Sequence, residues 1–224
     1  MILIFYQYFI REFEISISQV TDILSQIGFF ILVMMLFPLS LGPDPNKLSE
    51  YGIALVWIAA FVSVVPAYDR LFTDDYLHGF IEKAAHNDQP LGCYAAAKCL
   101  CFFLVTTIPL LIILPVICAM IGLNLSIFFE LAISLLLGLF GMTLLGGIAS
   151  GLVLGARRAA ILAAVLVLPL SLPIIIFGCM TGIALIETTP IKPYISIMIA
   201  MDLSLIVLAI PIMQLSLKNA IENN

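Results

Sequence analysis

The stretch CLCFFLVTTIPLLIILPVICAMIG, residues 99–122, contains no charged side chain and decides the fold class. A helix of about 20 apolar residues, rising about 1.5 Å per residue, crosses the roughly 30 Å hydrocarbon core of a membrane. Similar runs recur along the 224-residue chain, which is 63% hydrophobic, 10% charged, and has a mean hydropathy of +1.21. A soluble domain carries about a quarter charged residues, so this composition excludes a soluble globular protein. We predict an all-α membrane protein.

Six apolar segments are separated by short breaks that contain turn-forming or charged residues. The predicted spans are 23–41, 52–68, 99–122, 127–153, 159–186 and 194–217. Together they form one transmembrane domain, 23–217, between an N-terminal segment, 1–22, and a tail, 218–224.

The distribution of Lys and Arg predicts the orientation, because basic residues concentrate in cytoplasmic loops. With a cytoplasmic N-terminus, two basic residues, Lys47 and Lys192, fall outside. The basic residues inside are Arg11, Arg70, Lys83, Lys98, Arg157, Arg158 and Lys218. An even number of spans then places the C-terminus in the cytoplasm as well. Basic residues spread this thinly also argue against nucleic-acid binding.

The segment 1–22 has a polar stripe at steps of three or four residues. Its members are Gln7, Arg11, Glu14, Ser18 and Asp22. We expect an amphipathic helix that lies on the membrane lipids with this stripe toward water. The alternatives are a strand over Phe13 to Ser18, which alternates, or an extension of the first span.

Sequence motifs for catalysis or cofactor binding are missing. There is no G-x-x-x-x-G-K-[ST] phosphate-binding loop, and no H-E-x-x-H, G-x-S-x-G or C-x-x-C. Both histidines, His78 and His86, fall in a predicted cytoplasmic loop, and the five cysteines suit small buried apolar positions. We therefore expect no enzyme, no metal site and no cofactor bound by this chain.

The cytoplasmic segment 69–98 mixes charged and aromatic residues. Gly79 is expected to separate two short helices that either dock onto a cytosolic partner or lie among lipid headgroups. For docking, the polar rim would be Asp74, Asp75 and Glu82. The apolar contacts would be Leu71, Phe72, Tyr76, Phe80 and Ile81.

Glycines and prolines mark two of the spans. Gly147, Gly151 and Gly155, spaced by four, predict close helix packing, within the chain or at a dimer interface. In 159–186, Pro169 and Pro173 predict either a helix that breaks and partly re-enters the membrane or one tilted, kinked helix.

Asp202 is the one acidic residue well inside a predicted span. An ionisable residue at that depth is a functional candidate, facing the bundle interior or a wet cavity. The alternative is a hydrogen bond to a partner near the outer interface.

Three separated blocks resemble one known family. They are Phe37 to Pro45, Trp57 to Asp75 and Leu154 to Ile174, in which FPLSLGPDP, DRLFTDD, LGARR and VLPLSLPI stand. These blocks are similar to haem exporter protein B (CcmB), the membrane subunit of the cytochrome c maturation ABC transporter. The resemblance covers residues 23 to 180 and agrees in length and span number.

This resemblance implies an ABC-2-type permease of the bacterial inner membrane, paired in its complex and bound to a separate ATPase subunit that holds ATP and Mg²⁺. It assigns Arg70 to Lys83 as the coupling helix that enters a groove on the ATPase. The implied coupling residues are Arg70, Leu71, Phe72, Asp74, Asp75, Gly79 and Glu82.

The implied function is to couple ATP hydrolysis to haem delivery or to release of a haem-loaded chaperone. The implied partners are a tryptophan-rich haem-handling membrane subunit and, indirectly, a periplasmic haem chaperone. Two alternatives remain: an autonomous ion-coupled secondary transporter that uses Asp202, and an assembly scaffold that transmits no motion.

Overall fold

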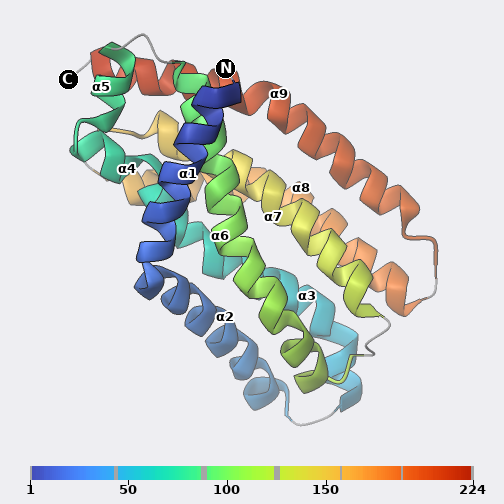
Figure 1. Ribbon diagram of the computed structural model, residues 1–224. Helices are drawn as coiled ribbons and strands as arrows, with labels where there is room; N and C mark the ends of the chain where they lie inside the picture. Colours follow the sequence, from blue (N-terminus) through green and yellow to red (C-terminus); the bar gives the residue numbers. More distant parts are fainter. Residues whose placement is uncertain are drawn as a thin grey trace.

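The computed structural model describes residues 2–42, 45–86, 90–123, 127–156, 158–187 and 189–222. All regular structure within these ranges is helical (Figure 1). The predicted all-α fold class is confirmed. Pro43, Asp44 and Arg157, which belong to motifs quoted above, lie outside the described residues.

The helices follow one another in the order that the apolar runs predict. Their bounds are α1 (Ile2–Ser18), α2 (Val20–Leu41), α3 (Pro45–Val64), the 3₁₀ helix η1 (Val65–Asp69), α4 (Arg70–Leu77), α5 (Phe80–His86), α6 (Leu91–Met120), α7 (Phe128–Leu152), α8 (Ala159–Ile186) and α9 (Lys192–Glu222).

Six segments of the described chain are long and apolar enough to cross a membrane, in agreement with the six predicted spans. They are Val20–Ser40, Glu50–Leu77, Leu91–Met120, Phe128–Leu152, Ile161–Ile186 and Lys192–Glu222. The second differs most from the predicted 52–68, because it continues through the 3₁₀ helix, which contains Pro66, to Leu77. The third begins at Leu91 rather than at 99, and the sixth continues through residue 218 to Glu222.

The helix α8 runs without a break through Pro169 and Pro173. The prediction of a broken, re-entrant helix is therefore wrong, and the single-helix alternative is correct. The helix packs against α7 and α9 although each proline removes one N–H donor from its ladder.

The core is centred on Trp57 of α3, which is completely buried. A Cβ atom added at Gly138 of α7 or at Gly178 of α8 would lie 2.2 Å from the Trp57 ring. Tyr68 of η1 lies in the same way against Gly146. The second span therefore sits deep in the bundle because two neighbouring helices present glycine at its aromatic rings.

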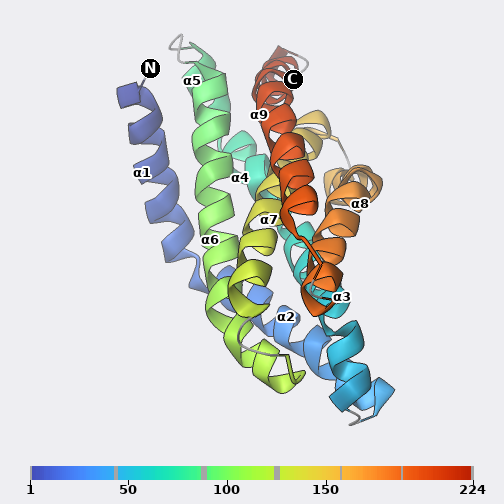
Figure 2. The same cartoon turned by 90° about the vertical axis from the view of Figure 1, so that its right-hand side faces the viewer.

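Both termini lie at one end of the bundle, together with α5 (Figures 1 and 2). The end of α2, the start of α3, the end of α6 and the start of α7 lie at the other end. The helix α1 runs beside the first half of α6, so it packs on the bundle through much of its length.

Candidate coupling site

The helices α4 and α5, which we call the α4–α5 hairpin, lie between η1 and α6, and α4 forms the end of the apolar segment Glu50–Leu77. Gly79 joins them with a φ of +68°, a left-handed conformation that glycine adopts without strain. The N–H of Gly79 donates to the Tyr76 carbonyl at 3.0 Å, and the N–H of Lys83 donates to the Gly79 carbonyl at 3.1 Å. The prediction that Gly79 separates two short helices is confirmed.

The inner face of this hairpin is part of the protein's own core. Leu71, Phe72 and Ile81 are 3%, 0% and 0% exposed, and they pack with Tyr8 of α1 and Tyr94 of α6. This differs from the expectation that these three side chains form an exposed apolar contact surface. They attach the hairpin to the bundle because the apolar side of α4 and α5 packs against α1 and α6.

The outer face of the hairpin is exposed and mainly polar. Leu77, which is 73% exposed, is its large apolar residue. The polar members that the structure leaves exposed are Arg70, Asp74, His78, Glu82, Lys83 and His86. Of the predicted coupling residues, Arg70, Asp74 and Glu82 therefore lie where another protein can reach them.

Asp75 was expected on a polar rim, but it is only 7% exposed and lies at the centre of a charged cluster. Its Oδ1 accepts a hydrogen bond from Arg11 Nη2 of α1 at 2.8 Å. Its Oδ2 accepts hydrogen bonds from the Tyr94 hydroxyl at 2.5 Å and from the Lys98 ammonium. The carboxylate faces inward because the side chains that satisfy it come from α1 and α6.

Two residues of α1 complete the charged cluster, which consists of Arg11, Glu12, Asp75, Tyr94 and Lys98. Glu12 Oε2 lies 2.8 Å from Lys98 Nζ, and its Oε1 pairs with Arg11. The Arg11 guanidinium carbon also lies 3.5 Å from the centroid of the Phe80 ring, as in a cation–π contact.

The expectation that the whole polar stripe of 1–22 faces water is therefore wrong at Arg11, whose side chain is 31% exposed. Burial lowers the pKa of Arg11, but the hydrogen bond to Asp75 and the two nearby carboxylates outweigh it and hold the pKa above its usual value. Arg11 therefore stays charged at any physiological pH.

The charged cluster is electrically balanced, with two cations and two carboxylates. The side chains of Glu12, Asp75 and Lys98 are 4%, 10% and 12% exposed. Removing one partner of a buried ion pair leaves an uncompensated charge and costs about 3–5 kcal/mol. The charged cluster thus joins α4 to α1 and α6, and any displacement of α4 acts on both helices.

Sequence reasoning missed Glu12, Tyr94 and Lys98. One signal was present: Lys98 is the one basic residue in the long apolar run of α6. A lone cation in such a run requires an acidic partner, although the run itself does not say which.

The predicted glycine ladder packs inside the chain. A Cβ atom at Gly147 would lie 2.7 Å from Met213 Sδ of α9, and one at Gly151 would lie 3.4 Å from Ser216 Cβ. Gly155 lies beyond the end of α7, where its φ of +82° permits the turn, and it faces the Tyr76 hydroxyl. The three glycines therefore do not form one continuous helix face.

The remaining predicted site residues lie apart from the hairpin. Asp202 is 6% exposed, and its Oδ2 has no hydrogen-bond partner among the described residues. Its Oδ1 lies against Gly141, where an added Cβ would be 2.4 Å away. Pro169 and Pro173 are exposed on α8 and do not reach Asp202 or the charged cluster through any described contact. The described residues hold no cluster of His, Cys, Asp and Glu suited to a metal ion.

Six apolar spans and an amphipathic hairpin anchored at one end define the class of this molecule, a polytopic membrane permease. The family described as CcmB protein matches residues 3–220. The chain therefore belongs to the CcmB family.

Curated relatives agree with this assignment. The chain is 36% identical over 176 residues to "Heme exporter protein B" of Haemophilus influenzae, which covers 79% of this chain and 80% of the relative. It is 32% identical over 196 residues to the Escherichia coli K12 protein of the same name, covering 88% and 89%. For the Pseudomonas aeruginosa protein of that name, the identity is 33% over 168 residues, 75% of each chain.

Proposed function

We propose that this chain is the permease subunit of an ABC transporter for cytochrome c biogenesis in the bacterial inner membrane. It couples ATP hydrolysis by a separate ATPase subunit to haem export or delivery, or to release of a haem-loaded chaperone. The family match and the name of the relatives support the haem-exporter part of this proposal. Both termini and the α4–α5 hairpin face the cytoplasm in this proposal, as the distribution of Lys and Arg favours.

One observation carries the coupling role: the two faces of the α4–α5 hairpin serve different contacts. The inner face is held in the core by Leu71 and Phe72, and Asp75 links it to α1 and α6. The outer face exposes Leu77 surrounded by charged residues, which is the pattern of an apolar interface centre with a polar rim. A partner that pulls on the outer face therefore moves α1 and α6 with the hairpin.

The other components follow from the proposed role. ATP and Mg²⁺ bind the ATPase subunit, and a tryptophan-rich membrane subunit with a periplasmic haem chaperone handles haem. Two copies of this chain pair in the complex, and α1 contacts membrane lipids at the cytoplasmic interface.

The test is purification of the tagged chain from its native membrane in mild detergent. We expect recovery of an ATPase with a phosphate-binding loop and a tryptophan-rich membrane protein. The double variant Leu77→Glu with Glu82→Lys should lower ATPase recovery at least tenfold, since central interface residues contribute about 2 kcal/mol or more. The matched control is Glu187→Lys, an exposed charge at the end of α8.

Equal ATPase recovery by the double variant and the control would contradict the coupling role of the hairpin. Phe72→Ala is not a suitable probe of docking, because Phe72 is fully buried and its loss acts on the fold.

A second candidate function rests on Asp202, whose buried Oδ2 has no described partner. Such a carboxyl group could carry an ion in an autonomous secondary transporter. In that case Asp202→Asn abolishes transport and the tagged chain purifies alone. In the ABC transporter the same variant has a modest effect and the ATPase is still recovered.

A further inference from the structure

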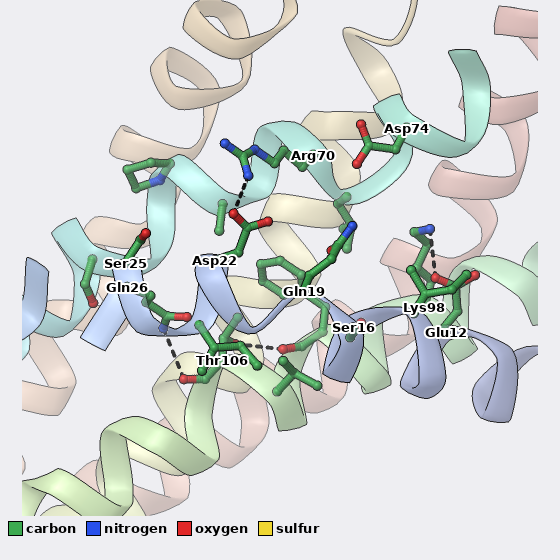
Figure 3. Close-up of a pocket in the computed structure, with 18 of the residues that line it drawn as sticks. Glu12, Ser16, Gln19, Asp22, Ser25, Gln26, Arg70, Asp74, Lys98 and Thr106 are labelled. Carbon is green, nitrogen blue, oxygen red and sulfur yellow. Dashed lines mark hydrogen bonds and ion pairs between the residues drawn. The ribbon is translucent and has the colours of Figure 1, made fainter. Parts of the chain in front are cut away.

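A cleft of about 520 Å³ lies beside the charged cluster and has no role in the coupling argument (Figure 3). Residues of α1, α2, α3, η1, α4 and α6 line it. Its volume is within the range of small-molecule sites, about 300–1,000 Å³.

One part of this cleft is apolar. Ile23 and Phe29 come from α2, and Phe102 and Val105 come from α6. The amide of Gln26 donates to the Thr106 carbonyl at 3.1 Å across the same region (Figure 3). That donor is already satisfied, so the apolar part suits a hydrocarbon chain.

The rim of the cleft is charged. Arg70 Nη1 pairs with Asp22 Oδ1 at 2.7 Å, and Asp74 lies on α4 one turn beyond Arg70 (Figure 3). The side chains of Arg70 and Asp22 are 63% and 48% exposed, so both remain accessible to a ligand. A guanidinium suits a phosphate group, and a pair of carboxylates suits an ammonium group.

The balance of charge in the cleft selects among headgroups. Four carboxylates line it, those of Glu12, Asp22, Asp74 and Asp75, against two cations, Arg70 and Lys98. Arg11 and Lys98 together neutralise Glu12 and Asp75, which leaves Arg70 with Asp22 and Asp74, an excess of one carboxylate. A ligand with net negative charge would be repelled, whereas a zwitterion satisfies both signs.

The cleft is continuous with the lipid-facing surface of α2. Phe29 lines the cleft and is also 42% exposed, and Val20 and Leu24 on the same helix are 52% and 60% exposed. Since the first span begins at Val20, the charged rim lies at the height of the lipid headgroups. A membrane lipid therefore reaches this cleft without leaving the bilayer.

Haem fits the cleft poorly. None of its described lining residues is His, Cys, Met or Tyr, so the iron would have no axial ligand. The haem propionates would also face the four carboxylates.

We propose that this cleft binds one phospholipid whose headgroup carries a phosphate and a primary ammonium. Arg70 binds the phosphate, Asp74 and Asp22 bind the ammonium, and an acyl chain lies along Phe29, Phe102 and Val105. This site does not depend on what the permease moves.

The test is native mass spectrometry of the full chain in detergent, titrated with ethanolamine, choline and glycerol phospholipids of identical acyl chains. We expect one ethanolamine lipid to bind at least tenfold more tightly than either of the others. Asp74→Asn should reduce the preference for the ethanolamine lipid over the choline lipid. Arg70→Gln should weaken the binding of both zwitterionic lipids about tenfold.

Two cleft-filling variants, Ala67→Phe and Ser25→Phe, should remove the tight site. The matched control is Ala200→Phe, which adds the same ring on the exposed surface of α9. Unfolding temperature identifies any variant that fails to fold, and the two filling variants lie on different helices. Equal binding of the three lipids, preference for the anionic glycerol lipid, or tight binding that survives both filling variants in folded protein would overturn the proposal.

Discussion

Trp57 and Asp75 are both buried, but their surroundings are opposite. The Trp57 ring fits because Gly138 and Gly178 have no side chain and leave the space that the ring fills. The Asp75 carboxylate is stabilised by hydrogen bonds and ion pairs with Arg11, Tyr94 and Lys98, which contact its two oxygens. The first arrangement depends on shape and the second on charge, so different substitutions break them.

The comparison predicts the largest effect at the shape-fitted position. Gly178→Leu places side-chain atoms where the Trp57 ring lies, and the helices cannot separate without exposing the core. We expect most of the protein to be lost as aggregate in size-exclusion chromatography in detergent. Gly28→Leu on α2 is the control, because an added Cβ there meets nothing within 4 Å. Similar elution of both variants would show that the Trp57 packing is not tight.

At the charge-fitted position, Asp75→Asn should lower the free energy of unfolding by about 3 kcal/mol, because Arg11 and Lys98 lose their shared carboxylate. The chain should still insert, since no apolar span changes. Reversible unfolding in mixed micelles measures the difference. The neighbouring Asp74 is exposed, so Asp74→Asn should change the free energy of unfolding by about 0.5 kcal/mol or less. Equal effects of the two variants would mean that the charged cluster is not formed in the membrane.

A double-mutant cycle sharpens the comparison further. Glu12→Gln and Lys98→Met each break the 2.8 Å contact between α1 and α6, and the double variant removes both charges. We expect a coupling energy of about 1–3 kcal/mol between the two positions. Strictly additive effects in the same unfolding assay would show that Lys98 relies on Asp75 alone.

The smallest effect is expected at the exposed pair. Arg70→Gln removes the contact with Asp22, but both side chains are in contact with solvent. Such pairs contribute about 1 kcal/mol or less, and salt weakens them. The thermal unfolding temperature should shift by no more than a few degrees, and the shift should shrink as salt is added. A loss as large as that of Asp75→Asn would place Arg70 among the structural charges.

These contrasts explain which features the sequence could predict. The spans were predictable because an apolar run such as 159–186 is local, and α8 occupies that range. The start of α6 at Leu91 was not predictable, because a charged residue such as Lys98 normally marks the end of a span. In the fold Glu12 and Asp75 neutralise it. Ion pairs between residues that are distant in the sequence cannot be predicted from local composition.

The candidate site shows the same limit. Asp74 and Glu82 of the predicted polar rim are exposed, but Asp75 has the same residue type as Asp74 and points inward. Adjacent residues on a helix point in directions about 100° apart. Only the position of α1 and α6 decides which of the two aspartates is buried. The tight contacts at Gly138 and Gly178 were likewise not predictable, because their partner Trp57 lies on another helix.

The charged cluster also has a consequence for the order in which the protein is made. Arg11 and Glu12 leave the ribosome first, yet Asp75 follows Arg11 by 64 positions in the chain, and Lys98 follows later still. At about 5–20 residues per second, α1 waits several seconds for the groups that hold it. The helix α1 is therefore fixed only after α6 has begun to form, and two full spans must be in the membrane before then.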